Sequence, residues 1–406
     1  MTKICFYFQV HQPFRLKEYS FLEIGAHKLY GNAELNKSIV QRIAKHCYLP
    51  TNQLLLNLIE LYGNRFKIAF SISGTALEQF EKYCPEVIAS FQTLVNTGNV
   101  ELLNETYYHS LASVHHQEEF VTQVRLHQEK IEEAFGVKPK VFRNTELIYN
   151  ESLVKMLQPF RFKAILCEGI EEYLDGKSPN FVYQSGGENR IPLLLRNRQL
   201  SDDISFRFSD ISSKDYPLTA EKYAQKLHQL QGSAEIVNLF MDYETFGEHQ
   251  WEDTGIFNFL RHLPQELLKH PDNDFKTPSE AIRTYNPVSE LDIHSPVSWA
   301  DIERDTSAWD GNDMQKSAIN EIYLMEEAIK KSKDQKLIND WRRLQISDHF
   351  YYMCTKWFND GDVHKYFNPY DNPYDAFITF MNIVNDINFR LKEHSDKNNL
   401  KKEVVV

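Results

Sequence analysis

Cysteine pairs, long apolar runs and a surplus of positive charge are all missing from this chain of 406 residues. The five cysteines include no CxxC pair, and their odd number in so long a chain argues against a disulfide framework. No stretch approaches the roughly 20 apolar residues that cross a bilayer, and the N-terminus lacks the features of a secretory signal. The net charge of −12 argues against nucleic acid or an anionic membrane as a partner. We therefore expect a cytoplasmic protein with reduced cysteines and with neither nucleic acid nor membrane as its partner.

Compact metal-binding spacings are missing too, because the chain contains neither an HExxH nor an HxH motif. A zinc-like site assembled from distant residues nevertheless remains an alternative, since imidazole and carboxylate groups are suitable ligands. Its candidate ligands are His11, His109, His115, His116 and Asp242. This alternative would make the protein a metal-dependent carbohydrate enzyme, such as a deacetylase or a mannosidase. The main interpretation needs no metal and no other cofactor.

Short apolar runs alternate with amphipathic segments through the first two-thirds of the chain. The expected strands are Ile4–Val10, Phe66–Ile72, Val100–Leu103, Val141–Asn144, Ala164–Cys167, Leu193–Leu195 and Ile236–Met241. The expected helices lie near residues 51–63, 76–97, 117–135, 150–159, 219–231 and 255–269. Such alternation is typical of βα units around a parallel sheet. Seven strands predict an α/β protein whose residues 1–270 form a (β/α)7 barrel, an incomplete relative of the TIM barrel.

The pattern changes in the last third of the chain. Residues 271–313 are rich in Pro, Asp, Asn and Ser, and we expect them to form a loop-rich connection that lines the cleft. Residues 314–394 predict a helical C-terminal subdomain, and the Lys-rich tail 395–406 is expected to be frayed. The helices expected in the subdomain are Met314–Lys331, Gln335–Phe358 and Tyr374–Glu393.

Two acidic segments follow predicted strands. Met241–His249 contains three carboxylates and a histidine, and it follows an apolar run that reads as a buried strand. Glu146 follows another short strand, 242 − 146 = 96 positions before Asp242. Catalytic groups of α/β barrels lie at the carboxyl ends of the strands. Two carboxylates in such positions suggest the paired acids of a glycoside hydrolase.

Each acid has a chemical and a structural interpretation. Arg143 and Asn144 beside Glu146 would keep it ionised and oriented, as a nucleophile needs, although a surface Glu at a βα turn is common. Asp242 and Glu244 share a strand face, and crowding of like charges would raise the pKa of one of them and create a general acid. Helix capping is the alternative for Asp242, but residues 253–254 are better placed for it.

His11-Gln12-Pro13 closes the first predicted strand, where a histidine can hydrogen-bond to sugar hydroxyls. The ordered set of motifs resembles the signature regions of glycoside hydrolase family 57, which contains α-amylases and 4-α-glucanotransferases. The regions that carry the resemblance are His11–Pro13, Gly98–Glu101, Phe142–Glu146, Met241–His249, Ser298–Asp301 and Ser347–Phe350.

The resemblance implies a (β/α)7 barrel that cleaves α-glucosidic bonds with retention of configuration. It implies Glu146 as the nucleophile and Asp242 as the general acid/base, with an α-glucan or maltooligosaccharide as the substrate. It also implies that His11 contacts the sugar and that Trp299 and Asp348 reach the substrate from the C-terminal side. The full set of expected substrate contacts is His11, Gln12, Arg143, Asn144, Glu244, His249, Trp299 and Asp348.

One departure from the family pattern concerns Arg143, because many members place a tryptophan at this position. The segment around Glu146 is more similar to the α-amylase branch. The favoured function is therefore a retaining hydrolase of α-1,4-glucosidic bonds in starch, glycogen or maltodextrins. A 4-α-glucanotransferase with the same site and an inactive glucan-binding relative are the alternatives, and the sequence specifies no oligomeric state.

Overall fold

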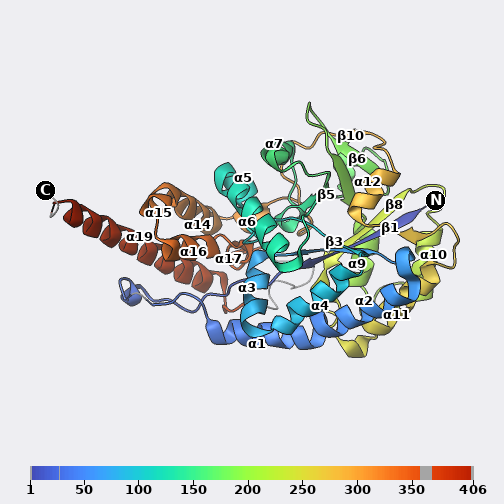
Figure 1. Cartoon of the computed structure of the whole chain (residues 1–406), viewed down its shortest axis with the longest axis horizontal. Helices are drawn as coiled ribbons and strands as arrows, with labels where there is room; N and C mark the ends of the chain where they lie inside the picture. Colours follow the sequence, from blue (N-terminus) through green and yellow to red (C-terminus); the bar gives the residue numbers. More distant parts are fainter. Residues whose placement is uncertain (1, 27, 357–367, 404–406) are drawn as a thin grey trace.

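The computed structural model describes residues 2–26, 28–356 and 368–403. Its centre is a set of parallel strands surrounded by helices (Figure 1). Every predicted strand forms, with each end within two residues of the expected position. They are β1 (Lys3–Val10), β2 (Ile68–Ile72), β3 (Val100–Leu102), β4 (Val141–Arg143), β5 (Ala164–Glu168), β7 (Pro192–Arg196) and β8 (Ile236–Asp242). The predicted α/β barrel class is confirmed.

The strands follow one another around the barrel. β8 pairs with β1, β1 with β2, and β2 with β3, all in parallel. A single parallel bridge between Asn104 and Phe142 connects β3 to β4, and β4–β5–β7 pairing follows. β7 and β8 share only the pair Arg196–Asn238, and the buried Asn238 side chain donates to the Leu195 carbonyl at 2.8 Å. A side chain thus satisfies backbone groups where the sheet is weakest.

Three further strands escape the sequence analysis because they are short or irregular. β6 (Val182–Ser185) runs antiparallel to β7, and β9 (Asp274–Phe275) and β10 (Glu290–Leu291) add two residues each at the edges. Two-residue strands carry no periodic pattern that a sequence can reveal.

Alternation along β1 divides the core into two layers. Cys5 and Tyr7 point into the barrel, where they meet Phe240 and the small Ala281. Phe6 and Phe8 point outward and pack with the surrounding helices. Both faces of a parallel barrel strand are therefore apolar, which explains the continuous hydrophobic run in the sequence.

The barrel helices include the expected ones, with one division. The predicted segment 76–97 forms two helices that meet at Cys84–Pro85, because proline has no N–H to continue the first helix. The helices are α1 (Ala33–Ile43), α2 (Leu49–Tyr62), α3 (Gly74–Tyr83), α4 (Pro85–Asn96), α5 (Ala112–His115), α6 (Gln117–Phe135), α7 (Glu151–Leu157), α8 (Glu171–Leu174), α9 (Arg198–Ser205), α10 (Ala220–His228), α11 (Ile256–Leu267) and α12 (Pro278–Thr284). A π-helical turn (Ala44–Tyr48) joins α1 to α2. No helix in the described part of the chain is both long and apolar enough to cross a membrane.

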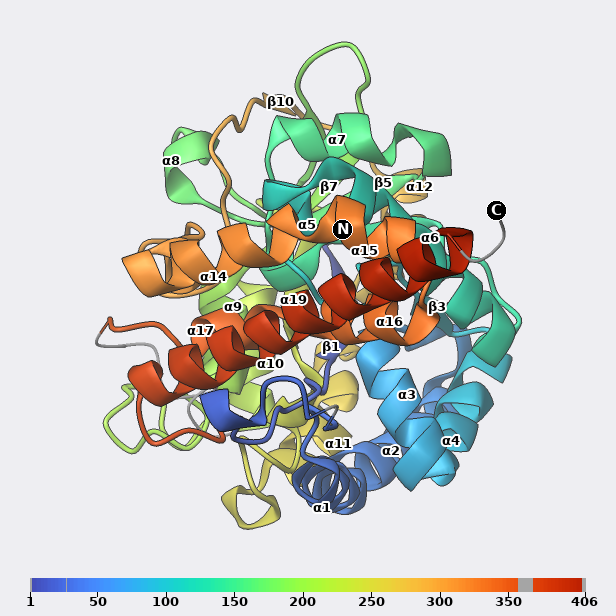
Figure 2. The same ribbon diagram turned by 90° about the vertical axis from the view of Figure 1, so that its left-hand side faces the viewer.

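The C-terminal helices lie at the end of the barrel toward which β1 runs, on the left of Figure 1. Figure 2 shows α14, α15 and α19 crossing in front of that end. They are α13 (Ser307–Asp310), α14 (Asp313–Leu324), α15 (Glu326–Ser332), α16 (Gln335–Arg343), α17 (Ser347–Tyr351) and α19 (Pro373–Glu403). α19 is longer than the predicted 374–393 and continues through most of the residues expected to fray. The predicted helix 335–358 divides into α16 and α17, and its last two positions lie outside the described residues.

Polar and apolar contacts attach these helices to the barrel. Leu16, Tyr19 and Tyr30, from the loop after β1, pack in the same cluster as the core of α14–α19. Buried Glu119 on α6 accepts from Arg342 on α16 at 2.8 Å, and Lys330 on α15 lies 3.1 Å from its other oxygen. The active end of the barrel is thereby covered by residues distant in sequence.

Candidate active site

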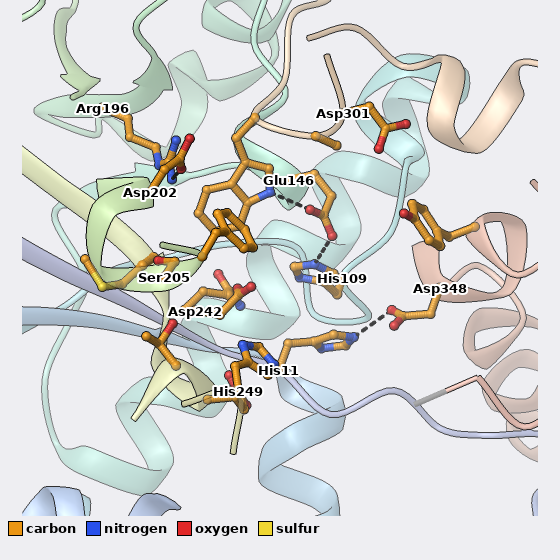
Figure 3. A pocket seen from close by; sticks show the side chains of 18 of the residues that line it. His11, His109, Glu146, Arg196, Asp202, Ser205, Asp242, His249, Asp301 and Asp348 are labelled. Atoms are coloured by element: carbon orange, nitrogen blue, oxygen red, sulfur yellow. Dashed lines mark hydrogen bonds and ion pairs between the residues drawn. The ribbon is translucent and has the colours of Figure 1, made fainter. Parts of the chain in front are cut away.

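A cavity of about 440 Å³ opens at the carboxyl ends of the strands, where the barrel meets the C-terminal helices (Figure 3). Most of the predicted site residues line it: His11, Gln12, Glu146, Asp242, Glu244, His249, Trp299 and Asp348. Its volume lies within the range of about 300–1,000 Å³ that is usual for small-molecule sites.

Glu146 follows β4 in a strained turn. Its φ of 55° and that of Leu147, 52°, are both in the left-handed region, which costs about 1–3 kcal/mol for such residues. The turn is held from several sides, since the Glu146 carbonyl accepts from the Trp299 backbone N–H at 3.2 Å. Trp299 Nε1 also donates to Glu146 Oε2 at 2.6 Å, and His109 Nε2 lies 3.1 Å from Glu146 Oε1. Both oxygens of this carboxylate are thus oriented, and only 4% of the residue is exposed.

His109 bridges two carboxylates. Its Nδ1 lies 3.0 Å from Glu105 Oε2, while its Nε2 faces Glu146. Burial alone would lower the pKa of His109, but the hydrogen bonds to Glu105 and Glu146 raise this pKa to about 9. Burial would raise the pKa of Glu105, and the hydrogen bond to His109 instead lowers it to about 2. At neutral pH the site therefore contains an imidazolium between two carboxylates.

His11 stacks on this imidazolium with ring centroids 4.0 Å apart. Its Nδ1 lies 2.7 Å from the Ser73 hydroxyl and its Nε2 lies 3.1 Å from Asp348 Oδ2 on α17. Burial first, and then the positive charge on His109, lowers the pKa of His11 to about 4. His11 is consequently neutral, and α17 contributes directly to the cavity through Asp348.

Asp242 and Glu244 follow each other on the cavity wall but differ in environment. Glu244 is 4% exposed; it accepts hydrogen bonds from Tyr48, and from Gln12 Nε2 at 3.3 Å. Burial, followed by the negative charge of Asp242, raises the pKa of Glu244 to about 8. Asp242 ends β8 and is half-buried, so it is the more accessible of the two acids. Of the two neighbouring acids, Glu244 is therefore the one whose pKa is raised by the like charge.

Trp299 lies near two buried guanidinium groups. The guanidinium carbon of Arg143 is 5.0 Å from its ring centroid and that of Arg196 is 5.6 Å away, distances suited to cation–π attraction. Arg196 is fixed by Glu168 at 3.1 Å and by Asp202 at 2.5 Å. The indole that donates to Glu146 is thus supported by cations from β4 and β7.

Comparison with known sequences identifies the family of this chain. Residues 5–294 match the sequence model of Glycosyl hydrolase family 57, which is more than half of the chain. The chain belongs to glycosyl hydrolase family 57. The matched residues include both proposed catalytic acids, Glu146 and Asp242, and the predicted family resemblance is confirmed.

Known relatives of this family 57 protein have several names. It is 43% identical over 417 residues to a Methanocaldococcus jannaschii protein named "Putative alpha-amylase", covering 98% of this chain and 88% of that one. The structure of 4-alpha-glucanotransferase from Thermococcus litoralis has a TM-score of 0.65 at 15% identity, covering 86% of this chain and 56% of that protein. A family 57 branching enzyme from Thermococcus kodakaraensis also has a TM-score of 0.65 at 15% identity, covering 86% and 85%. The two structural likenesses show a shared fold.

In this family 57 protein, two expected substrate contacts lie away from the cavity. Arg143 is fully buried beneath Trp299, and Asn144 donates to the Ser113 hydroxyl at 2.8 Å and to the Ile148 carbonyl at 2.9 Å. Neither residue lines the cavity. His109 and Trp299, which belong to neither the strand nor the turn of Glu146, both hydrogen-bond to the Glu146 carboxylate.

The histidines proposed as metal ligands have other partners. His116 pairs with Glu326 at 2.8 Å, and His115 stacks against Tyr323. His11 and His109 use their ring nitrogens in the hydrogen bonds described above. Among the described residues, no three His, Cys, Asp or Glu side chains gather as a metal-binding group.

Several residues that contact the site were not predicted as catalytic groups or substrate contacts. Glu105 lies in the polar run after β3, and His109 in the same run was expected only as a candidate metal ligand. Tyr48 and Arg196 reach the site from a π-helical turn and from the end of β7. Glu105 and Arg196 lie at or just after the carboxyl end of a strand, and this position is the one signal that could have identified them.

Proposed function

We propose that this protein is a retaining glycosidase that cleaves α-1,4-glucosidic bonds in starch, glycogen or maltodextrins by double displacement. The observation that carries the proposal is the presence of Glu146 and Asp242 on one cavity, beyond β4 and at the end of β8. Glu146 is oriented by two hydrogen bonds, as a nucleophile requires. The relative named for alpha-amylase activity supports an α-glucan as the substrate.

Two steps complete the reaction. Glu146 attacks the anomeric carbon and the glycosidic C–O bond breaks, while Asp242, which has taken up a proton before this step, gives that proton to the leaving oxygen. Asp242 then accepts a proton from water, the water oxygen bonds to the anomeric carbon, and the bond to Glu146 breaks. Two inversions at one carbon retain the α configuration.

The remaining cavity residues suit a neutral, hydroxyl-rich ligand. Protonated Glu244 can exchange hydrogen bonds with hydroxyl groups, and neutral His11, whose ring nitrogens bind Ser73 and Asp348, adds an uncharged surface. Trp299 offers an aromatic surface, and Asp348 and His249 add further polar groups at the wall. We propose that these side chains bind the sugar at the bond to be cleaved.

Replacing the proposed nucleophile is the decisive test. Glu146→Gln should lower turnover of maltoheptaose by at least about 10³-fold, because the amide cannot form the covalent intermediate. Binding measured by calorimetry should be largely retained. Glu172→Gln, on the exposed surface of α8, is the matched control and should keep full activity. Normal turnover by the Glu146 variant would remove this residue from the mechanism.

The products separate hydrolysis from transfer. A retaining hydrolase releases the α-anomer first, which proton NMR of fresh maltoheptaose digests detects before mutarotation. All products should be shorter than the substrate. Accumulation of oligosaccharides longer than maltoheptaose would assign the protein to the glucanotransferases.

A further inference from the structure

Glu105 is a fully buried carboxylate to which the proposed mechanism gives no role. It follows β3, it does not line the cavity, and it is 0% exposed. Its Oε2 lies 3.0 Å from His109 Nδ1, and its Oε1 accepts from Gln9 Nε2 at 3.2 Å. A buried charge of this kind is costly unless it is paired, so its partner, His109, indicates what it does.

The geometry at His109 suits a charged ring as long as Glu105 and Glu146 are both ionised. Both of its nitrogens face carboxylate oxygens, and both can donate a hydrogen only when the ring is an imidazolium. A neutral ring would place a lone pair against one carboxylate. Its backbone, with φ of 49°, lies in the left-handed region, so the fold accepts strain to keep the ring there.

Charged and titratable groups from five elements surround this ring. Glu105 lies on the loop after β3 and Glu146 lies beyond β4. His11 lies at the end of β1, with Asp348 of α17 behind it. Arg143 and His127 lie beside Glu105. His11 is neutral and His127 has a pKa lowered by burial. Glu105 and Glu146 are therefore the anions in direct contact with His109.

We propose that Glu105 is a positioning residue that acts through His109, keeping this ring protonated while the sugar is bound to Glu146 and so assisting release of the Glu146 carboxylate. The proposal rests on the proposed function. It adds a role in the second step to a residue that touches neither the substrate nor the reacting atoms.

The negative charge around His109 changes during the reaction. When Glu146 bonds to the anomeric carbon it becomes a neutral ester, and Glu105 is then the remaining anion in contact with His109. Burial would favour loss of the ring proton at this stage, and Glu105 opposes it. In the second step the electron pair of the breaking bond returns to Glu146, whose Oε1 lies 3.1 Å from His109 Nε2. A charged donor already in place stabilises this developing carboxylate. His109 transfers no proton, so Asp242 alone accounts for the proton balance.

The direct test is the titration of His109 by NMR in the full chain. The wild-type ring should titrate near pH 9, well above the ordinary 6.5. Glu105→Gln preserves the size and an acceptor oxygen but removes the charge, and it should lower the pKa of His109 by about 1–3 units. Glu101→Gln is the matched control on the same strand, at its opposite end, and should leave this titration unchanged.

Kinetics then test the assigned step. With maltosyl fluoride, whose leaving group is activated, the second step limits turnover. Glu105→Gln should lower kcat on this substrate by about 10–100-fold and produce a burst of one fluoride per active site. Loss of activity at high pH should also begin at a lower pH in this variant. Glu105→Asp keeps the charge and should recover most of the rate.

Each failure has a distinct meaning. A wild-type His109 that titrates below pH 7 overturns the proposal even if no variant folds. An unchanged His109 titration in Glu105→Gln, or equal losses in the Gln and Asp variants, also overturns it. Failure of the glycosidase assignment would instead appear as full activity of Glu146→Gln, and the NMR titration does not depend on turnover.

Discussion

At the scale of single residues, the site depends on carboxyl groups that differ in charge despite their proximity. Glu105 is kept ionised by His109, whereas Glu244 is kept protonated near neutral pH by burial and by Asp242. Glu146 is oriented by two donors, the cationic ring of His109 and the neutral indole N–H of Trp299. Environment, and not residue type, therefore separates the roles of these acids.

Glu244 provides a stability test at this scale. Its folded pKa of about 8 exceeds the ordinary 4.5, so the folded state retains a proton that the unfolded state releases between these values. Unfolding free energy should therefore fall as pH rises from 4.5 to 8. Glu244→Gln removes this titration, and the stability difference between variant and wild type should shift in favour of the variant by up to about 5 kcal/mol across this window. Urea unfolding at pH 4.5, 6 and 8 measures it, and a pH-independent difference would contradict the assignment.

At the scale of elements, α17 connects the C-terminal helices to catalysis because it supplies Asp348, the partner of His11. Its position depends on the docking of α15 and α16 onto α6. Glu119 on α6 receives Arg342 and Lys330 from these two helices and is 0% exposed. Its charge holds together segments more than 200 residues apart in sequence.

Removal of this docking charge should affect both stability and substrate binding. Glu119→Ala leaves the half-buried Arg342 without its carboxylate partner and should cost about 3 kcal/mol of unfolding free energy. KM for maltoheptaose should rise more than kcat falls, because Asp348 lines the cavity and is proposed to bind the sugar, not to act on the reacting bond. The control is Glu327→Ala on α15, which removes an exposed ion pair with Lys331 and should change stability by less than about 1 kcal/mol. Equal effects of the two substitutions would show that α6 does not anchor these helices.

At the scale of the whole molecule, opposing histidine titrations define the pH of greatest stability. The pKa of His109 is raised to about 9, so the stability it contributes is complete below 6.5 and is lost as pH rises through 9. Burial lowers the pKa of His11 and of His349 to about 4, so stability is lost as pH falls from 6.5 toward 4.

The directions of these pKa shifts predict a thermal unfolding midpoint that is highest near pH 6.5 and declines on both sides. Differential scanning fluorimetry from pH 4 to 10 measures the curve. Glu105→Gln should weaken the decline on the alkaline side and leave the acidic side unchanged. A midpoint that kept rising to pH 9 would exclude the imidazolium between the two carboxylates.

The amino-acid sequence by itself determined the barrel, because its strands are buried on both faces and their continuous apolar runs are visible without a partner. It also located Glu146, Asp242 and Glu244, since strand ends are local features of the chain. Only the tertiary structure decided which groups contact Glu146. Sequence proximity favoured Arg143 and Asn144, but the carboxylate hydrogen-bonds to His109 and Trp299, which lie 37 and 153 positions away. Backbone direction at a single turn and contacts between distant elements depend on the whole fold, and no local pattern encodes them.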